Sequence, residues 1–171
     1  MMKEKIKLVV TKIYDIFFAR IANFAITRYM DTGFLFKYLL YGNEERLKIA
    51  KTAVVNNATF NTISGTIQIG EYVFFGLNVT VLTGTHDYNK FGRERQITVP
   101  AFEKDVIIKE GAWLASNVTV IGPCIIGEHS VVAACSLVNK DVPPYTIVAG
   151  IPARVIKKIT PPSNTDQTVC K

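Results

Sequence analysis

The feature that most constrains this chain is an aliphatic residue that returns at every sixth position through its second half. Counted from residue 108, the series reads Ile108, Leu114, Val120, Ile126, Val132 and Val138. A small or β-branched residue follows four positions after each: Ala112, Val118, Cys124, Ser130, Ser136 and Val142. The same series runs upstream through Ile63, Ile69, Phe75 and Val81, with Ile67, Val73, Val79 and Thr85 at the small position. A repeat of fixed period therefore has to explain the fold.

A period of six fits very short strands and no helix, because about 100° per residue would carry successive members to different helix faces. The fourth and sixth positions of each unit are two apart, so both point to the same side of a strand. The remaining residues form a corner, where Gly70, Gly76, Asn117, Gly122 and Gly127 fall. The strands of an ordinary sandwich repeat every eight to twelve residues, so we predict an all-β solenoid with three units per turn.

The repeat is interrupted after Val81, since no six-residue unit fits the stretch "HDYNKFGRERQITVPA". We therefore expect a loop of residues 87–101 to leave the solenoid directly after His86. Loops on rigid scaffolds often carry binding chemistry, and imidazole, with an ordinary pKa of about 6.5, suits proton transfer at neutral pH. His86 is the candidate catalytic residue. The second histidine, His129, falls in a corner and is expected to have no role.

Composition limits the class of protein and of partner. Of the 171 residues, 49% are hydrophobic and 20% charged, which indicates one soluble unit with a smaller appendage. The net charge of +6 favours an anionic partner, and without a nucleic-acid-binding signature we expect a phosphate-bearing cofactor, an acidic glycan or a membrane surface rather than DNA. Three cysteines without paired spacing indicate no metal site and no disulfide. No targeting segment is apparent, so we expect a cytoplasmic location.

The two ends differ from the repeat region. Residues 1–53 are expected to be helical, with apolar residues at helical spacing: Ile6, Val9, Ile13, Phe17, Ile21 and Phe24. A second helix is expected from Phe34 to Lys51, broken near Gly42. A cap over the open end of the solenoid is one interpretation, and docking on a partner or on the inner face of a membrane is the other. Residues 159–171 are polar and proline-rich and are expected to form a flexible tail.

Two stretches carry a resemblance to a known family. "IIGEHSVVAACSLV" with "KDVPPYTIVAGIPARVIKKI" resembles the hexapeptide-repeat acyltransferases, and "NATFNTISGTIQIGEYVFFGLNV" with "THDY" is similar to the sugar and polysaccharide O-acetyltransferases, near the maltose and galactoside enzymes. The resemblance covers residues 54–158. It implies a left-handed parallel β-helix with an N-terminal helical cap and a short C-terminal helix or tail; the handedness comes from the resemblance alone. It also implies a homotrimer in which loop 87–101 reaches over the neighbouring subunit.

The same resemblance implies an acetyl-CoA-dependent O-acetyltransferase that acts on a saccharide hydroxyl of capsule, lipopolysaccharide or a small sugar. His86 would be the general base for direct transfer. Substrate-binding positions would be Asn56, Asp87 and Trp113, and cofactor-binding positions would be Ser116, Ala134, Asn139, Lys140 and Arg154.

Several of these positions have a plainer interpretation as well. Asp87 also fits a loop carboxylate, Trp113 fits packing between subunits, and Lys140 with Arg154 fits solvated surface charge. Where the family usually reads "GAGSVVTKDV", this chain reads "VAACSLVNKDV", with Cys135 in place of Gly and Asn139 in place of Thr.

Three other functions are known for solenoids of this kind or would use the same fold. A sugar-nucleotide N-acetyltransferase would use the same donor and base on an amine, and a non-catalytic scaffold or binding protein would keep the solenoid without needing a base. A β-helical carbonic anhydrase needs three histidine zinc ligands, and the chain has only two histidines. The first two alternatives stay open at the level of sequence.

Overall fold

The structure, a computed structural model of the 171-residue chain, describes residues 11–12, 14–24, 37–100 and 103–161. The chain divides into two units, residues 1–37 and 38–171. In the first, residues 11–12 and 14–24 are helical. In the described part of the chain, no helix has both the length and the apolar character needed to cross a bilayer. The predicted tail lies largely outside the described residues.

The second unit consists of short strands, one 3-10 turn and one short helix. The strands are β1 Leu39–Tyr41, β2 Leu47–Ile49, β3 Thr59–Asn61, β4 Ile67–Ile69, β5 Phe74–Phe75, β6 Thr80–Leu82, β7 Val106–Ile108, β8 Trp113–Leu114, β9 Thr119–Ile121, β10 Cys124–Ile126, β11 Val131–Val132, β12 Leu137–Val138, β13 Thr146–Gly150 and β14 Ala153–Lys158. The 3-10 turn is η2 Glu44–Arg46, and the helix is α2 Gly92–Ile97.

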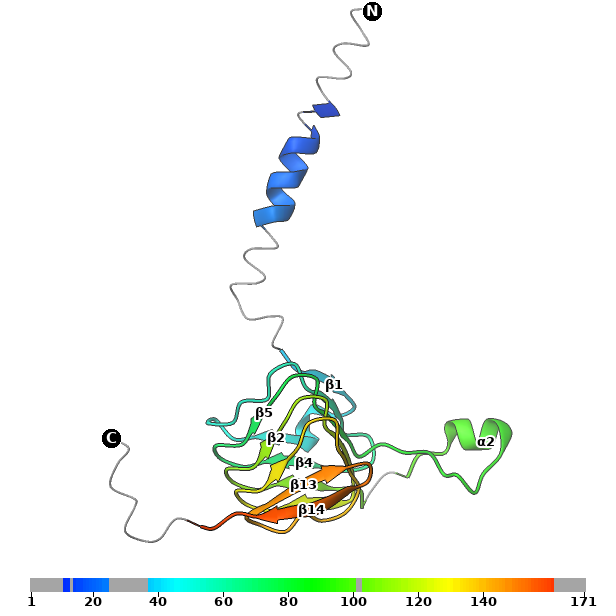
Figure 1. The fold of residues 1–171 in the computed structure, drawn as a ribbon. Helices are drawn as coiled ribbons and strands as arrows, with labels where there is room; N and C mark the ends of the chain where they lie inside the picture. The colour runs from blue at the N-terminus through cyan, green and yellow to red at the C-terminus, as the bar shows by residue number, and fades with distance from the viewer. Residues whose placement is uncertain (1–10, 13, 25–36, 101–102, 162–171) are drawn as a thin grey trace, which may run out of the picture. The chain divides into compact units, whose positions relative to one another are not determined.

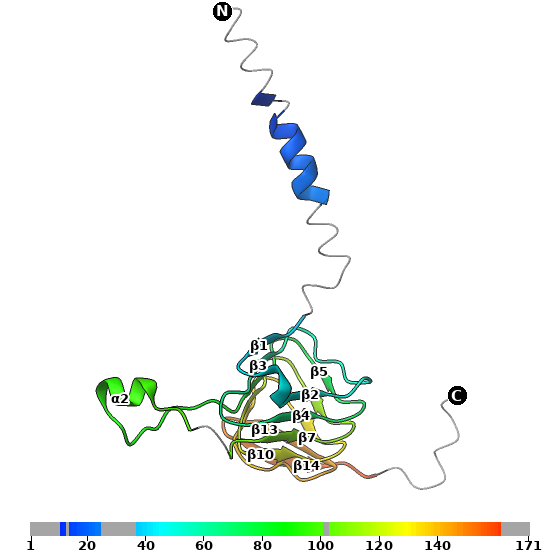
Figure 2. The same cartoon turned by 180° about the vertical axis from the view of Figure 1, so that it is seen from behind.

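Successive strands take their places in three different sheets, so the chain winds as a coil (Figures 1 and 2). Sheet A has the order β1-β3-β6-β9-β12, sheet B the order β10-β7-β4-β2, and sheet C the order β14-β13-β11-β8-β5. Named strands pair in parallel except β13 with β14, which are antiparallel. The mostly parallel solenoid expected from the six-residue period is therefore present.

The core consists of the residues that define the repeat. The six aliphatic residues of the downstream series are each at most 1% exposed. Ile108 pairs with Ile126, Leu114 with Val132, and Val120 with Val138, each 18 positions apart as expected for three units per turn. Apolar area is thus buried by stacking one coil on the next.

Upstream of residue 67 the simple period fails. The residue that stacks on Val81 is Phe60, not Ile63 as the period predicts. Phe60 is fully buried, and its ring lies 5.5 Å from that of Tyr38 and 6.3 Å from that of Phe75. The corner between β3 and β4 spans residues 62–66, whereas the equivalent corner between β9 and β10 spans only residues 122–123, so counting back in sixes arrives at the wrong residue.

The helix expected from Phe34 to Lys51 is wrong. Residues 39–41 and 47–49 are strands, and only η2 between them is helical. Leu47 and Ile49 pair in register with Ile67 and Ile69, so the parallel pairing of the coil begins well before residue 54. Gly42 has a φ of +121°, which no helix residue adopts. Tertiary pairing thus overrides a spacing that also fits a helix.

The expected short C-terminal helix is also absent from the described residues. Ala153–Lys158 form strand β14, which turns back after Gly150 and pairs with β13. This antiparallel strand lies at the edge of sheet C and occupies the position where the next coil would begin.

The two described cysteines differ in burial, and we expect their thiols to differ in reactivity. Cys124 is buried in the stack, where burial and then Asp141 raise the pKa of its thiol to about 12, whereas Cys135 is exposed. Because the thiolate is the reactive form, we expect a maleimide to modify Cys135 and leave Cys124 unmodified up to pH 9, as read by peptide mapping. Because the pKa of Cys124 in the folded state lies above the ordinary thiol value of 9, the contribution of this thiol to folding stability is fully present below pH 9. It is lost as the pH rises from 9 towards 12. Rapid labelling of native Cys124 at pH 8 would contradict the assignment.

Candidate active site at the root of the loop

His86 lies where the chain leaves the coil at the end of sheet A. The preceding residues are held by the neighbouring coil: Thr83 Oγ1 donates to the Asn61 carbonyl at 2.8 Å and accepts from Ser64 N at 3.2 Å. Gly84 lies so close to the Asn61 amide that a Cβ added there would be 2.4 Å from Asn61 Oδ1. The backbone that leads to His86 is therefore anchored before the loop begins.

The imidazole itself is exposed. Within the residues that the structure describes, it makes no hydrogen bond or ion pair, which leaves both ring nitrogens available to a ligand. The adjacent Asp87 is engaged elsewhere: its Oδ1 accepts from Asn89 N at 3.0 Å, and its own N–H donates to Thr98 O at 3.2 Å. Asp87 thus holds the two ends of the loop together and does not orient the imidazole.

The loop projects from the coil and carries helix α2 (Figures 1 and 2). It is braced from within: Arg95 Nη2 donates to Tyr88 O at 3.1 Å, and the Arg95 guanidinium lies 4.9 Å from the centre of the Phe91 ring. Tyr88, Phe91 and Ile97 are 80%, 77% and 66% exposed. A braced loop that presents bulky apolar side chains beside a histidine is suited to covering a substrate or a neighbouring subunit.

Ser116 and Ala134 lie at the opposite end of sheet A from His86, in the corners that precede β9 and β12. Ser116 Oγ accepts from Leu77 N at 3.1 Å, and the Ser116 carbonyl accepts from Cys135 N at 3.0 Å. For the N–H of Ser116 no hydrogen bond is found among the described residues. This corner therefore offers a fixed backbone donor, although in one chain it is not next to His86.

Asn56 lies in the same set of corners and is bonded to the coil. Its Nδ2 donates to Phe75 O at 2.6 Å, and its backbone adopts a φ of +44°, which asparagine tolerates better than most residues. These contacts are enough to explain an asparagine here without a substrate.

Trp113 lies on β8 in sheet C, also away from His86. Its ring stacks on Phe74 at 5.5 Å with an interplanar angle of 16°. It belongs to an apolar row that runs along the outer face of the sheet through strands paired in register: Val54, Phe74, Trp113, Val131 and Ile147. This row, exposed at Val54, Phe74 and Trp113 and half-buried at Val131 and Ile147, fits packing between subunits at least as well as contact with a substrate.

Three of the predicted cofactor residues do come together. Asn139, Lys140 and Arg154 line one hollow of about 280 Å³. Asn139 and Lys140 follow β12, at the same end of sheet A as His86. Asp141 lines the hollow too, but its Oδ1 accepts from Ile125 N at 2.8 Å. The hollow thus has two exposed cations beside one carboxylate that is tied to the coil.

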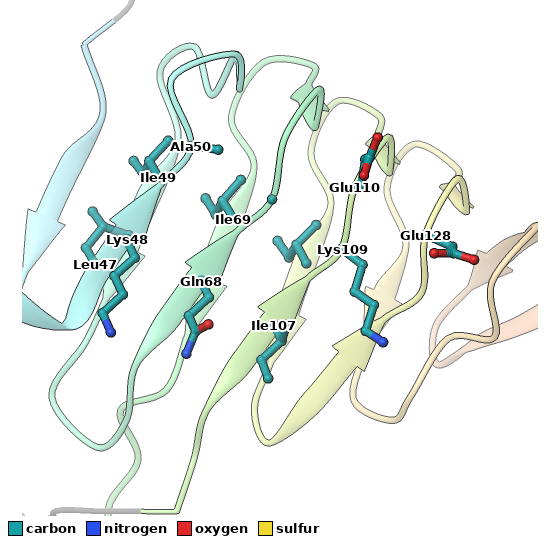
Figure 3. Close-up of a pocket in the computed structure, with 12 residues that line it drawn as sticks. Leu47, Lys48, Ile49, Ala50, Gln68, Ile69, Ile107, Lys109, Glu110 and Glu128 are labelled. Atoms are coloured by element: carbon teal, nitrogen blue, oxygen red, sulfur yellow. The ribbon is translucent and has the colours of Figure 1, made fainter. Parts of the chain in front are cut away.

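A larger hollow, of about 730 Å³, lies along the outer face of sheet B (Figure 3). Lys48, Gln68 and Ile107 form a row across it, because their strands pair in register. None of the predicted site residues lines this hollow. The larger hollow therefore does not coincide with the predicted site residues. We favour the start of loop 87–101 as the active site because His86 lies there beside the projecting loop.

Asn61 is a candidate that the sequence analysis missed. It pairs with Leu82 at the end of β6, and its amide lies against Gly84, two residues before His86. Its Oδ1 accepts from Ile63 N at 3.0 Å. The irregular corner after β3 hid this position, since the six-residue count places Ile63, rather than Phe60, beneath Val81.

Comparison with known proteins agrees with this architecture. Residues 105–140 match the family model described as bacterial transferase hexapeptide (six repeats). The chain is 37% identical over 109 residues to a galactoside O-acetyltransferase of Lactococcus lactis, covering 63% of this chain and 51% of that protein. It is 30% identical over 115 residues to a putative lipopolysaccharide biosynthesis O-acetyl transferase of Escherichia coli, covering 56% of this chain and 59% of that protein. The chain spans about half the length of the curated relatives it matches.

Among solved structures, a hexapeptide-repeat acetyltransferase from Vibrio cholerae superposes with a TM-score of 0.62 at 27% identity, covering 80% of this chain and 81% of that one. A second structure of a hexapeptide-repeat acetyltransferase from Vibrio cholerae, complexed with acetyl coenzyme A, superposes with a TM-score of 0.52 at 29% identity, covering 80% and 79%. The repeat and the three parallel sheets agree with these relatives: residues 105–140 match the hexapeptide-repeat transferase model, and the chain is similar in sequence and fold to acetyltransferases that carry this repeat.

Proposed function

We propose that this protein is an acetyl-CoA-dependent O-acetyltransferase that acts on a saccharide hydroxyl in the cytoplasm or at the inner face of the membrane, with His86 as general base. The observation that carries the proposal is the exposed imidazole of His86 at the anchored root of a projecting loop. Relatives that are named O-acetyltransferases of galactosides and of lipopolysaccharide biosynthesis support a sugar acceptor. The family also supports a left-handed sense for the coil.

In the proposed reaction, a ring nitrogen of His86 accepts the proton of the sugar hydroxyl while its oxygen attacks the thioester carbonyl. The resulting tetrahedral intermediate carries a negative charge on oxygen, which a backbone donor such as the N–H of Ser116 would stabilise. When the intermediate collapses, the C–S bond breaks and the imidazolium returns its proton to the departing thiolate. The products are the sugar acetate and free coenzyme A, and no acyl-enzyme is needed.

We further propose that the protein acts as a homotrimer. A single chain holds His86 at one end of sheet A, Ser116 at the other end and Trp113 on sheet C, so no one chain brings all three together. Placing a second coil beside the first would let a backbone donor of one subunit face the histidine of the next. The apolar row on sheet C, exposed at Phe74 and Trp113, and the apolar side chains of the loop are surfaces that such packing would cover.

The hollow beside Lys140 and Arg154 leads to a prediction for the donor. If these cations face the phosphates of coenzyme A, Lys140→Gln and Arg154→Gln should each raise KM for acetyl-CoA about three- to tenfold and leave kcat nearly unchanged. Steady-state kinetics at fixed acceptor measure this, with Lys51→Gln, at an exposed lysine between β2 and β3, as a charge-matched control. Variants with wild-type KM would assign both cations to solvated surface charge.

The experiment that tests the function measures release of free thiol from acetyl-CoA against a panel of acceptors: simple sugars, polysaccharides, nucleotide-linked aminosugars and water alone. Release that depends on a sugar hydroxyl supports the proposal. Release that depends only on an aminosugar would make the enzyme an N-acetyltransferase. No release with any acceptor, together with no binding of coenzyme A by calorimetry, would leave a non-catalytic scaffold.

A further inference from the structure

The helix of residues 14–24, blue in Figure 1, gathers bulky apolar side chains on one face. At 3.6 residues per turn, positions 14, 17, 18, 21 and 24 fall in one stripe. These side chains are between 48% and 69% exposed: Tyr14, Phe17, Phe18, Ile21 and Phe24. The rings within the stripe touch, with Tyr14 and Phe18 at 5.0 Å and Phe17 and Phe18 at 6.1 Å between centroids. Together they form a continuous apolar surface.

The opposite face of the same segment is polar and carries cations. Lys12, Asp15, Arg20 and Asn23 lie there, and among the residues that the structure describes Ile16 is the one bulky apolar residue on this face. In sequence, residues 1–28 contain six Lys and Arg and two acidic residues, although the whole chain has a net charge of only +6. Residues 1–28 therefore hold four of the six excess positive charges, of which residues 11–24 hold one, from Lys12 and Arg20 against Asp15.

We propose that this helix lies flat on the surface of a membrane that contains anionic phospholipid, with the stripe of residues 14, 17, 18, 21 and 24 in the acyl boundary and Lys12 and Arg20 among the headgroups. Exposed Phe and Ile on one face with Lys and Arg on the other is the pattern of interfacial helices. The cations are complementary to anionic lipid. A spanning orientation is disfavoured because it would carry Lys12, Asp15 and Arg20 into the bilayer core.

The inference does not depend on the reaction, and it deepens the proposed function by favouring an acceptor that is held at a membrane. The test is co-sedimentation of the full-length protein with phosphatidylcholine vesicles prepared with and without phosphatidylglycerol. We expect sedimentation with the anionic vesicles and at least about tenfold weaker binding to phosphatidylcholine alone.

Two matched variants separate the contribution of the apolar stripe to vesicle binding from the effect of adding a negative charge to the helix. Phe17→Glu places a carboxylate in the stripe and should weaken binding to anionic vesicles by about tenfold or more. Ala19→Glu places the same carboxylate on the polar face and should weaken it by no more than about threefold. Circular dichroism and thiol release with a soluble acceptor, measured on both variants, show that the coil and any transferase activity are retained.

Three results would overturn the proposal: no sedimentation of the wild type with anionic vesicles, equal losses in Phe17→Glu and Ala19→Glu, or a change of oligomeric state in Phe17→Glu with vesicle binding unchanged. The last would mean that the stripe packs against a second copy of the chain. If vesicles bind but no acceptor releases thiol, the proposed reaction fails and the membrane surface stands.

Discussion

Replacing His86 by alanine is expected to lower kcat for acetyl transfer by about 10²- to 10⁴-fold and to leave the fold intact. The loss is large because the variant lacks the positioned base that accepts the proton of the sugar hydroxyl, and a hydroxyl that keeps its proton is a poor nucleophile. The fold should be unaffected because the imidazole is exposed, and no hydrogen bond or ion pair to it is found in the described part of the chain. Thiol release at saturating acetyl-CoA and acceptor measures the loss of kcat. The midpoint of thermal unfolding shows whether the fold is retained.

The second histidine supplies the matched control. His129 lies in a distant corner, where its ring is 5.2 Å from that of Tyr145. His129→Ala should therefore keep kcat within about twofold of the wild type. An active His86→Ala variant would remove the general base from the mechanism and return attention to Asn61 and to residues of the loop.

Replacing Phe60 by alanine is expected to lower the free energy of unfolding by about 3–5 kcal/mol. Phe60 is fully buried, stacks on Val81 in sheet A and contacts the rings of Tyr38 and Phe75, so truncation leaves a cavity inside the first complete coils. A loss of this size is a large share of the 5–15 kcal/mol typical of a folded domain. Chemical denaturation followed by circular dichroism measures it.

A phenylalanine on the loop is the control for that experiment. Phe91 is 77% exposed, and Phe91→Ala should change the free energy of unfolding by no more than about 0.5 kcal/mol. If Phe60→Ala were equally mild, Phe60 would not be a core residue of the coil, and the pairing of β3 with β6 would have to be revised.

Much of the coil was predictable from local pattern, because each unit obeys the same rule. Ile108, Leu114 and Val120 recur at a spacing that only very short strands accommodate, and their burial follows from alternation along a strand. The position of the loop was predictable for the same reason: a regular series makes its own interruption visible at His86.

The first coils were not predictable in this way. Residues 34–51 have apolar residues at a spacing that fits a helix as well as strands, and Leu47 and Ile49 are strand residues only because Ile67 and Ile69 lie beside them. Phe60 replaces Ile63 in the stack because the corner after β3 holds additional residues, and no local signal reports the length of a corner. Asn61 was missed for that reason.

By itself, then, the sequence determined the solenoid, the place where its loop leaves and the histidine at that place, since these depend on a period and on its interruption. Tertiary structure decided which side chains share a corner: it gathered Asn139, Lys140 and Arg154 around one hollow and set Ser116 and Trp113 apart from His86. The physical reason is that inward positions are set by alternation along each strand, whereas the neighbours of an outward side chain depend on which coil stacks beside it and on how long each corner is.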